Sequence, residues 1–315
     1  MADMVFSGVT FTGGYSISLP AGSGNKAIFS YGSVATIIGY TNLVSNTGVV
    51  ADDTALVGTS RTFLAAAGYG TDKAIFGYGN SGSLTAITNL VSNTGVVATD
   101  TTGVGTSRAA LAAAGYGTDK AIFGYGNSGS VTALTNLVNN TGVVATDTTG
   151  VGTARSVLAA AKYSTDKAIF GYGYNGTAVV SMTNLVSNTG VVATDTTGVG
   201  TARSGVAAAG YGTDKAIFGY GTTDGLGTGR TSITNLVSNT GVVASDTTGV
   251  GTVRLNLAAA TYGTDKAIFG YGTNNQSPVP TYFNMTNLVS NTGVVGNDVT
   301  GVGYPRAGLA AAAYG

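Results

Sequence analysis

The chain has 315 residues, 14 basic and 14 acidic side chains, and a charged fraction of only 9%. A net charge of zero offers no electrostatic attraction to nucleic acid or to an acidic membrane surface, so neither is expected as a partner. Cys and His are absent, which excludes a catalytic metal held by thiolate or imidazole ligands. We expect no metal and no cofactor.

Residues 1–13 precede the repeats and match no part of them. Four large apolar side chains in this segment would be poorly buried in isolation, which predicts an N-terminal arm that adds to a sheet edge or to a neighbouring subunit. The segment lacks the basic start and long apolar run of a signal peptide. No apolar run in the chain reaches the length of a membrane span, so we expect no membrane insertion.

Residues 14–315 are predicted to form one repeat architecture. A Lys-Ala-Ile-Phe segment occurs six times, at Lys26, Lys73, Lys120, Lys167, Lys215 and Lys266. The units run at about 25–71, 72–118, 119–165, 166–213, 214–264 and 265–315. The distance from the Asn of Thr-Asn-Leu-Val to the next Arg is 19 residues in all six units, and from that Arg to the next Lys it is 12. Every insertion therefore falls between Gly-Tyr-Gly and Thr-Asn-Leu, which predicts a surface loop there.

Each unit is predicted to contain four short strands, here illustrated by residues 111–147. The strands are Leu111–Tyr116, Lys120–Gly126, Val131–Val138 and Val143–Asp147, separated by a Gly-Thr-Asp turn, the variable loop and an Asn-Thr-Gly turn. The alanine triplets favour helix by propensity. Each apolar piece spans only about six residues, too short for a stable helix, so we predict a four-stranded antiparallel meander.

The fold class predicted is all-β, a six-bladed β-propeller of four-stranded antiparallel blades. A linear stack of repeats needs polar capping units, whereas the end units here are as apolar as the middle ones. Residues 14–24 contain only a degenerate first strand, and Leu309 to Tyr314 is a spare one. We therefore expect residues 306–315 to close the ring beside Lys26–Gly32. Alanine suits strands crowded at the axis.

The repeat resembles the kelch-type β-propeller family, whose units are about 50 residues long. The resemblance covers residues 25–315 and rests on Pro305-Arg306 and on the aromatic strand and glycines of Ile75–Gly79. Tyr78 splits the adjacent glycines of the family pattern, and the family's late Trp is missing. The alanine-rich strand, turn and aromatic strand also look like the RCC1-type repeat, which usually forms seven blades. The resemblance implies a propeller rather than an activity.

Nearly all charged residues recur once per unit. A catalytic group normally occupies one distinct environment, so we predict that these charges form ion pairs and that the protein is not an enzyme. The charges outside the pattern are Asp3, Asp52, Lys162, Asp224 and Arg230. The repeated tyrosines, such as Tyr78 and Tyr125, are predicted to lie between blades rather than to stack on sugars.

Two functions are compatible with these features. The first is a structural or adhesive propeller, because near-identical repeats and low charge resemble bacteriophage tail-fibre, tail-tip or capsid-decoration proteins. It would contact other structural subunits, further copies of itself in a homo-oligomer, or a host-surface receptor, in a virion or other extracellular particle after cytoplasmic synthesis. The alternative is a soluble lectin-like propeller that binds glycan or protein.

Partner binding is expected to be asymmetric and centred on the variable loops of units five and six, which carry the longest insertions. Exposed aromatic and Arg side chains favour interfaces. The candidate binding residues are Tyr174, Asn175, Asp224, Arg230, Gln276, Tyr282 and Phe283.

Overall fold

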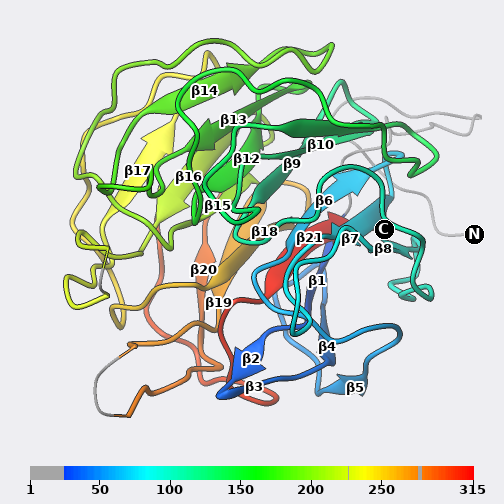
Figure 1. Cartoon of the computed structure of the whole chain (residues 1–315). Coiled ribbons are helices and arrows are strands. Elements are labelled where there is room, and N and C mark those ends of the chain that lie inside the picture. Colours follow the sequence, from blue (N-terminus) through cyan, green and yellow to red (C-terminus); the bar gives the residue numbers. More distant parts are fainter. Residues whose placement is uncertain (1–24, 226, 276–278) are drawn as a thin grey trace, which may run out of the picture.

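The computed structural model describes residues 25–225, 227–275 and 279–315 (Figure 1). These residues form antiparallel β-sheets and contain no helix, as the sequence predicts. The predicted N-terminal arm, residues 1–13, and the degenerate strand in residues 14–24 lie outside the described residues.

Five sheets share one design of three antiparallel strands in sequence order. They are β6 (Ala65–Tyr69), β7 (Lys73–Gly77) and β8 (Thr88–Val91); β9 (Ala112–Tyr116), β10 (Lys120–Gly124) and β11 (Thr135–Val138); β12 (Ala159–Tyr163), β13 (Lys167–Gly171) and β14 (Thr183–Val186); β15 (Ala207–Tyr211), β16 (Lys215–Gly219) and β17 (Thr234–Val237); and β18 (Ala258–Tyr262), β19 (Lys266–Gly270) and β20 (Thr286–Val289). The first three predicted strands of each of these units are therefore present.

A sixth repeat sheet combines the two ends of the repeat region, and β2 (Ser33–Val34) and β3 (Thr36–Ile37) form a separate two-stranded sheet. The order of the sixth sheet is β21-β1-β4-β5, with β21 at Ala310–Tyr314, β1 at Lys26–Ser30, β4 at Tyr40–Val44 and β5 at Thr54–Ala55. Strand β21 is antiparallel to β1, with Lys26 opposite Tyr314 and Ser30 opposite Ala310. The predicted pairing of the C-terminal segment with the first Lys strand is confirmed.

The prediction of a regular fourth strand is wrong for the five three-stranded sheets. In the third unit, the segment predicted at Val143–Asp147 forms no strand beside β11. An isolated bridge joins Val138 to Val144, and a second joins Thr135 to Thr148 just beyond the segment. The Asn136 side-chain amide donates to the Ala145 carbonyl at 3.0 Å and to the Asp147 carboxylate at 2.9 Å. Side-chain bonds thus replace part of the backbone ladder.

The first strands of the sheets lie against one another in a fixed order. Strand β6 packs against β9, β9 against β12, β12 against β15, β15 against β18 and β18 against β21, and β21 also packs against β6. In Figure 1 these strands lie toward the middle of the molecule, and third strands such as β14, β17 and β20 lie farther out. The alanine-rich strands are therefore the inner ones, as their small side chains predict.

The core lies between successive sheets. Ala74, Ile75 and Phe76 of β7 are all completely buried, although adjacent residues of a strand point to opposite faces. Ile75 and Tyr78 pack into one cluster with Phe123 of the next sheet. Full burial of an Ile or Phe side chain stabilises a fold by about 1.5–3 kcal/mol, so each sheet depends on a neighbour at both faces.

The tyrosine of each Gly-Tyr-Gly segment has a left-handed backbone. Tyr78 has φ 63°, a conformation that costs free energy for a bulky residue and persists only where the surroundings impose it. Its ring lies 5.1 Å from the ring of Phe123. Glycine is required just before it, because a Cβ on Gly77 would lie 2.7 Å from the Phe123 ring.

Candidate functional site

The repeated arginines are buried groups of the interior. Arg108 has no exposed surface. Its Nε donates to the Tyr125 carbonyl at 2.9 Å, one terminal nitrogen to the Thr106 carbonyl at 3.1 Å, and the other to the Asn136 side-chain oxygen at 2.6 Å. A buried arginine is tolerated when its donors are satisfied in this way.

The repeated aspartates complete the same network. The Asp147 carboxylate accepts bonds from the Thr106 hydroxyl at 2.6 Å and from Asn136 at 2.9 Å, and lies 3.8 Å from Arg108. Burial alone would raise the pKa of Asp147, but these hydrogen bonds outweigh it and hold the pKa below its ordinary value. Equivalent ion pairs join Arg61 to Asp100, Arg155 to Asp195, Arg254 to Asp298 and Arg306 to Asp53.

Arg203 departs from this arrangement. One of its terminal nitrogens donates to the Ile233 carbonyl at 2.6 Å and to the Tyr220 carbonyl at 3.3 Å, while the other bonds to Asn235. The prediction that the repeated Arg and Asp residues form ion pairs is thus confirmed for five arginines, namely Arg61, Arg108, Arg155, Arg254 and Arg306.

The turn lysines form a second and more exposed set of pairs. Each donates to the aspartate directly before it, and the nitrogen–oxygen distances are 2.8–2.9 Å. These lysines are Lys73, Lys120, Lys215 and Lys266. Exposed pairs of this kind contribute little to stability.

The predicted binding residues of the fifth unit organise their own loop. The Asp224 carboxylate accepts bonds from the Thr222 and Thr228 hydroxyls and from the backbone amides of Gly227, Thr228 and Gly229. The hydrogen bonds from Thr228 and Thr222 hold the pKa of Asp224 far below its ordinary value. Arg230 donates to the Gly227 carbonyl at 2.8 Å.

The candidates of the fourth unit are also engaged locally. The Tyr174 hydroxyl donates to the Gly176 carbonyl, and the Asn175 side chain accepts from Thr177 and Ala178. In the sixth unit, Phe283 is half-buried, and its backbone bonds to Gly272 and Arg306. Gln276 lies outside the described residues.

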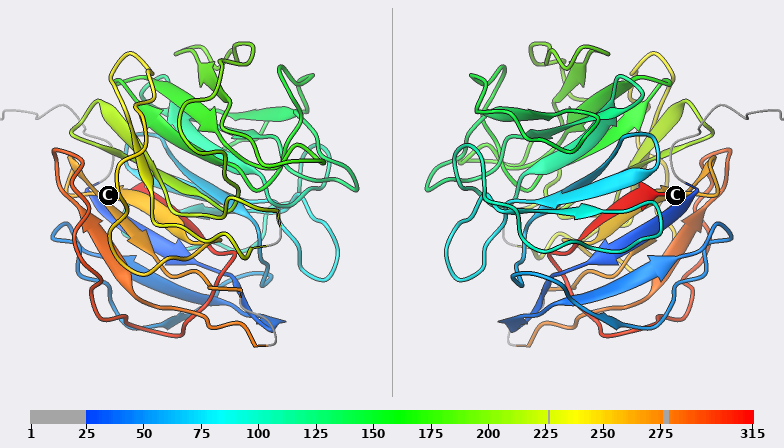
Figure 2. Two further views of the ribbon diagram at one scale, coloured as in Figure 1. Left: turned by 90° about the vertical axis from the view of Figure 1, so that its left-hand side faces the viewer. Right: turned by 90° about the vertical axis from the view of Figure 1, so that its right-hand side faces the viewer.

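The structure nevertheless brings four variable loops together. A Cβ placed on Gly225 would lie 3.4 Å from the Tyr174 ring, and one on Gly227 would lie 2.8 Å from the Asn275 amide. The Tyr282 hydroxyl accepts a hydrogen bond from the backbone amide of Ala35 at 3.2 Å. Ala35 connects β2 (Ser33–Val34) and β3 (Thr36–Ile37), and Figure 2 shows this dark blue hairpin beside the orange loop of the sixth unit. The loops of units four, five, six and one therefore touch in succession.

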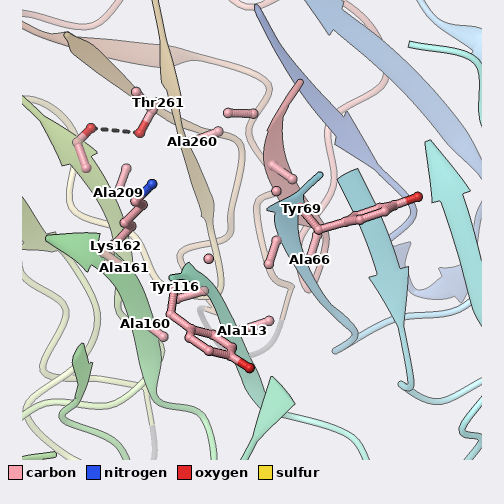
Figure 3. A pocket seen from close by; sticks show the side chains of 18 of the residues that line it. Ala66, Tyr69, Ala113, Tyr116, Ala160, Ala161, Lys162, Ala209, Ala260 and Thr261 are labelled. Carbon is pink, nitrogen blue, oxygen red and sulfur yellow. Dashed lines mark hydrogen bonds between the residues drawn. The ribbon is translucent and has the colours of Figure 1, made fainter. Parts of the chain in front are cut away.

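A pocket of about 130 Å³ lies among the six inner strands. Its wall is formed largely by alanine and glycine, including Ala66, Ala113 and Ala160, and Lys73, Lys120 and Lys215 also line it. Figure 3 shows Lys162 extending into this pocket from β12. At the equivalent position the other inner strands carry Gly68, Gly115, Gly210, Thr261 and Ala313.

Lys162 was not among the predicted binding residues. Its only sequence signal is that it breaks the Ala-Ala-Ala-Gly-Tyr pattern. Burial lowers the pKa of Lys162, and the charge of Asp166 opposes this effect. The pocket thus combines a wall of alanine and glycine with polar side chains, and one of its amines is partly desolvated.

Fold and contacts define an all-β repeat protein of antiparallel sheets joined by a buried Arg–Asn–Asp network. No protein-family model and no curated protein sequence matches the chain, so the kelch-type resemblance stays a prediction. Within the described residues, no helix could cross a membrane. The same part of the chain holds no group of three or more acidic side chains placed to bind a metal ion.

Proposed function

We propose that the six sheets form a closed six-bladed β-propeller. The order of the inner strands supports this, because β21 packs against both β18 and β6 and also pairs with β1. Isolated bridges extend each three-stranded sheet outward, at the place where a fourth strand would lie. An image of single particles along the axis tests the proposal, since an open arc of sheets would contradict it.

We propose further that this propeller is a non-enzymatic structural or adhesive protein, which contacts its partner through the variable loops. The supporting observation is the succession of loop contacts from Tyr174 through Gly225 and Asn275 to Tyr282 and Ala35. Most of the described repeated charges are hydrogen-bonded or paired with other residues of the protein. The units differ from one another mainly in the variable loops that form this continuous surface. A component of a virion or appendage, as its repeats suggest, would present such a surface to other subunits or to a host receptor.

The test replaces residues 222–232 and 273–285 by the short loop of the fourth unit. The variant should keep the sheet spectrum and melting temperature of the wild type and lose binding to surfaces or subunits. A matched control exchanges the corresponding loops of the second and third units with each other and should bind normally. Unchanged binding by the first variant would contradict the role of these loops.

A lectin-like receptor is the second candidate, and the partly exposed rings of Tyr174 and Tyr282 on the touching loops favour it. Aromatic rings provide apolar faces for sugar recognition. A glycan array distinguishes the candidates, because a lectin retains specific glycan binding as an isolated protein. Turnover of a glycoside, ester or phosphate that is lost on changing a single Asp would contradict both.

A further inference from the structure

The pocket among the inner strands contains a cation that lacks a bonded partner. Lys162 makes no hydrogen bond or ion pair with any residue in the described part of the chain, and Asp166 acts on it only as a nearby charge. By contrast, Lys73, Lys120 and Lys215 at the same pocket each pair with the preceding aspartate. A partly buried ammonium without a partner is costly, and a bound anion would remove that cost.

The wall around Lys162 limits which anion fits. Ala160, Ala161 and Ala209 line the space. The Thr261 hydroxyl donates to the Gly210 carbonyl at 2.9 Å. Further hydroxyl side chains line the pocket, namely Thr71, Thr118, Ser164, Thr213 and Thr264. A carboxylate with a short apolar body would use the Lys162 ammonium and the alanine wall together, whereas a phosphate or sulfate dianion has no apolar part to place against that wall.

We propose that this pocket binds a short-chain aliphatic carboxylate, with its carboxylate on Lys162 and its alkyl group against the alanines. The volume of about 130 Å³ restricts the ligand to a small molecule. The site lies away from the variable loops, so it is independent of the loop surface proposed above. It would make the six sheets a receptor for a small organic anion as well as a scaffold.

The experiment is calorimetric titration of the full chain with butyrate, with inorganic phosphate and chloride as comparison probes. Lys162→Met keeps the aliphatic stem and removes the charge, while Lys162→Gly restores the residue found at Gly68 and Gly115. Both should weaken butyrate binding at least about tenfold, the loss expected for a hydrogen bond to a charged group. The control Lys266→Met removes a lysine that does not line the pocket and is paired with Asp265, so it should bind butyrate within about twofold of the wild type.

A second measurement uses the wild type alone and does not depend on the folding of any variant. Nuclear magnetic resonance of the Lys162 side chain should show its pKa rising when butyrate is added, because the carboxylate stabilises the charged amine. Absence of butyrate binding, equal binding by Lys162→Met, or an unmoved Lys162 pKa overturns the proposal. Tighter binding of phosphate or chloride than of butyrate overturns the assignment to a carboxylate.

Discussion

The guanidinium carbon of Arg108 lies 4.3 Å from the centre of the Tyr78 ring. Arg108 precedes β9 and Tyr78 follows β7, so the contact joins two successive sheets. Six such pairs occur, and all their distances lie between 4.3 and 4.7 Å. A desolvated cation over an aromatic face contributes about 2 kcal/mol. The arginines therefore hold the sheets to one another as well as ordering the loops before them.

Replacing Arg108 by Ala should lower the free energy of unfolding by about 3–5 kcal/mol, because the change leaves buried partners without their donor. Arg108→Lys should not restore stability, since an ammonium cannot reproduce the three-way bonding of a planar guanidinium. Urea unfolding measures both. Lys120→Ala, which breaks only an exposed pair, is the matched control and should cost less than about 1 kcal/mol. If Arg108→Lys were as stable as the wild type, the proposed contribution of the Arg108 guanidinium stacked on Tyr78 would be contradicted.

The buried tyrosines predict unfolding at alkaline pH. Burial raises the pKa of Tyr31, Tyr78, Tyr125, Tyr220 and Tyr271 to about 12 from 10.0. Because these groups ionise more easily in the unfolded chain, their stabilisation is present below pH 10 and is lost as the pH rises toward 12. The loss is about 1.4 kcal/mol per pH unit for each tyrosine.

Tyrosinate absorbance followed together with circular dichroism tests this expectation. The two signals should change in one cooperative step. Tyr78→Phe loses the bond from its hydroxyl to the Val104 carbonyl and should make the alkaline slope shallower by one proton. Independent titration near the ordinary tyrosine pKa, with the sheet signal intact, would refute the prediction.

The network aspartates predict a second instability in acid. After the opposing effect of burial, hydrogen bonds from Thr and Asn lower the pKa of Asp100, Asp147, Asp195, Asp246 and Asp298 from 3.8. Their stabilisation is therefore present above about pH 4 and is lost as the pH falls through the lowered values. Thr106→Val removes one donor to Asp147 and should shift acid unfolding upward in pH. Thr102→Val, at an exposed threonine, should leave the acid midpoint unchanged.

Deleting residues 306–315 should remove most of the stability. Strand β1 would lose its inner partner, and β18 and β6 would each lose a neighbour. Thermal melting measures the loss, and a synthetic peptide of the deleted residues added in trans should restore part of it. A truncated protein that melts like the full chain would show that β21 is dispensable.

The inner and second strands were predictable because their signals are local. Ala112–Tyr116 and Lys120–Gly124 are short apolar runs bounded by Gly and turn residues, repeated at constant spacing. The pairing of β21 with β1 followed from a spare strand at one end and a degenerate one at the other. The tyrosine rings also lie between sheets, as expected from their fixed register.

Features that depend on side-chain competition were not predictable. Val143–Asp147 has the composition of a strand, but the Asn136 side-chain amide donates hydrogen bonds to the Ala145 carbonyl and the Asp147 carboxylate in that segment. The stacking of Arg108 on Tyr78 requires the relative position of two sheets, which spacing alone does not define. The chemical setting of Lys162 depends on five other strands meeting around it, so the sequence shows only that the residue is unusual.

The pairing of β1 with β21 has a consequence for synthesis on the ribosome. Strand β1 emerges before every other described strand, but its inner partner β21 is the last of the described strands to be translated. Until then an apolar strand edge stays open, and edges of this kind invite pairing with other chains. On an mRNA that carries many ribosomes, the open edge of β1 in one nascent chain can therefore pair with the alanine-rich strand β21 of a neighbouring chain. We expect slow translation or high expression to favour strand-exchanged dimers over monomers.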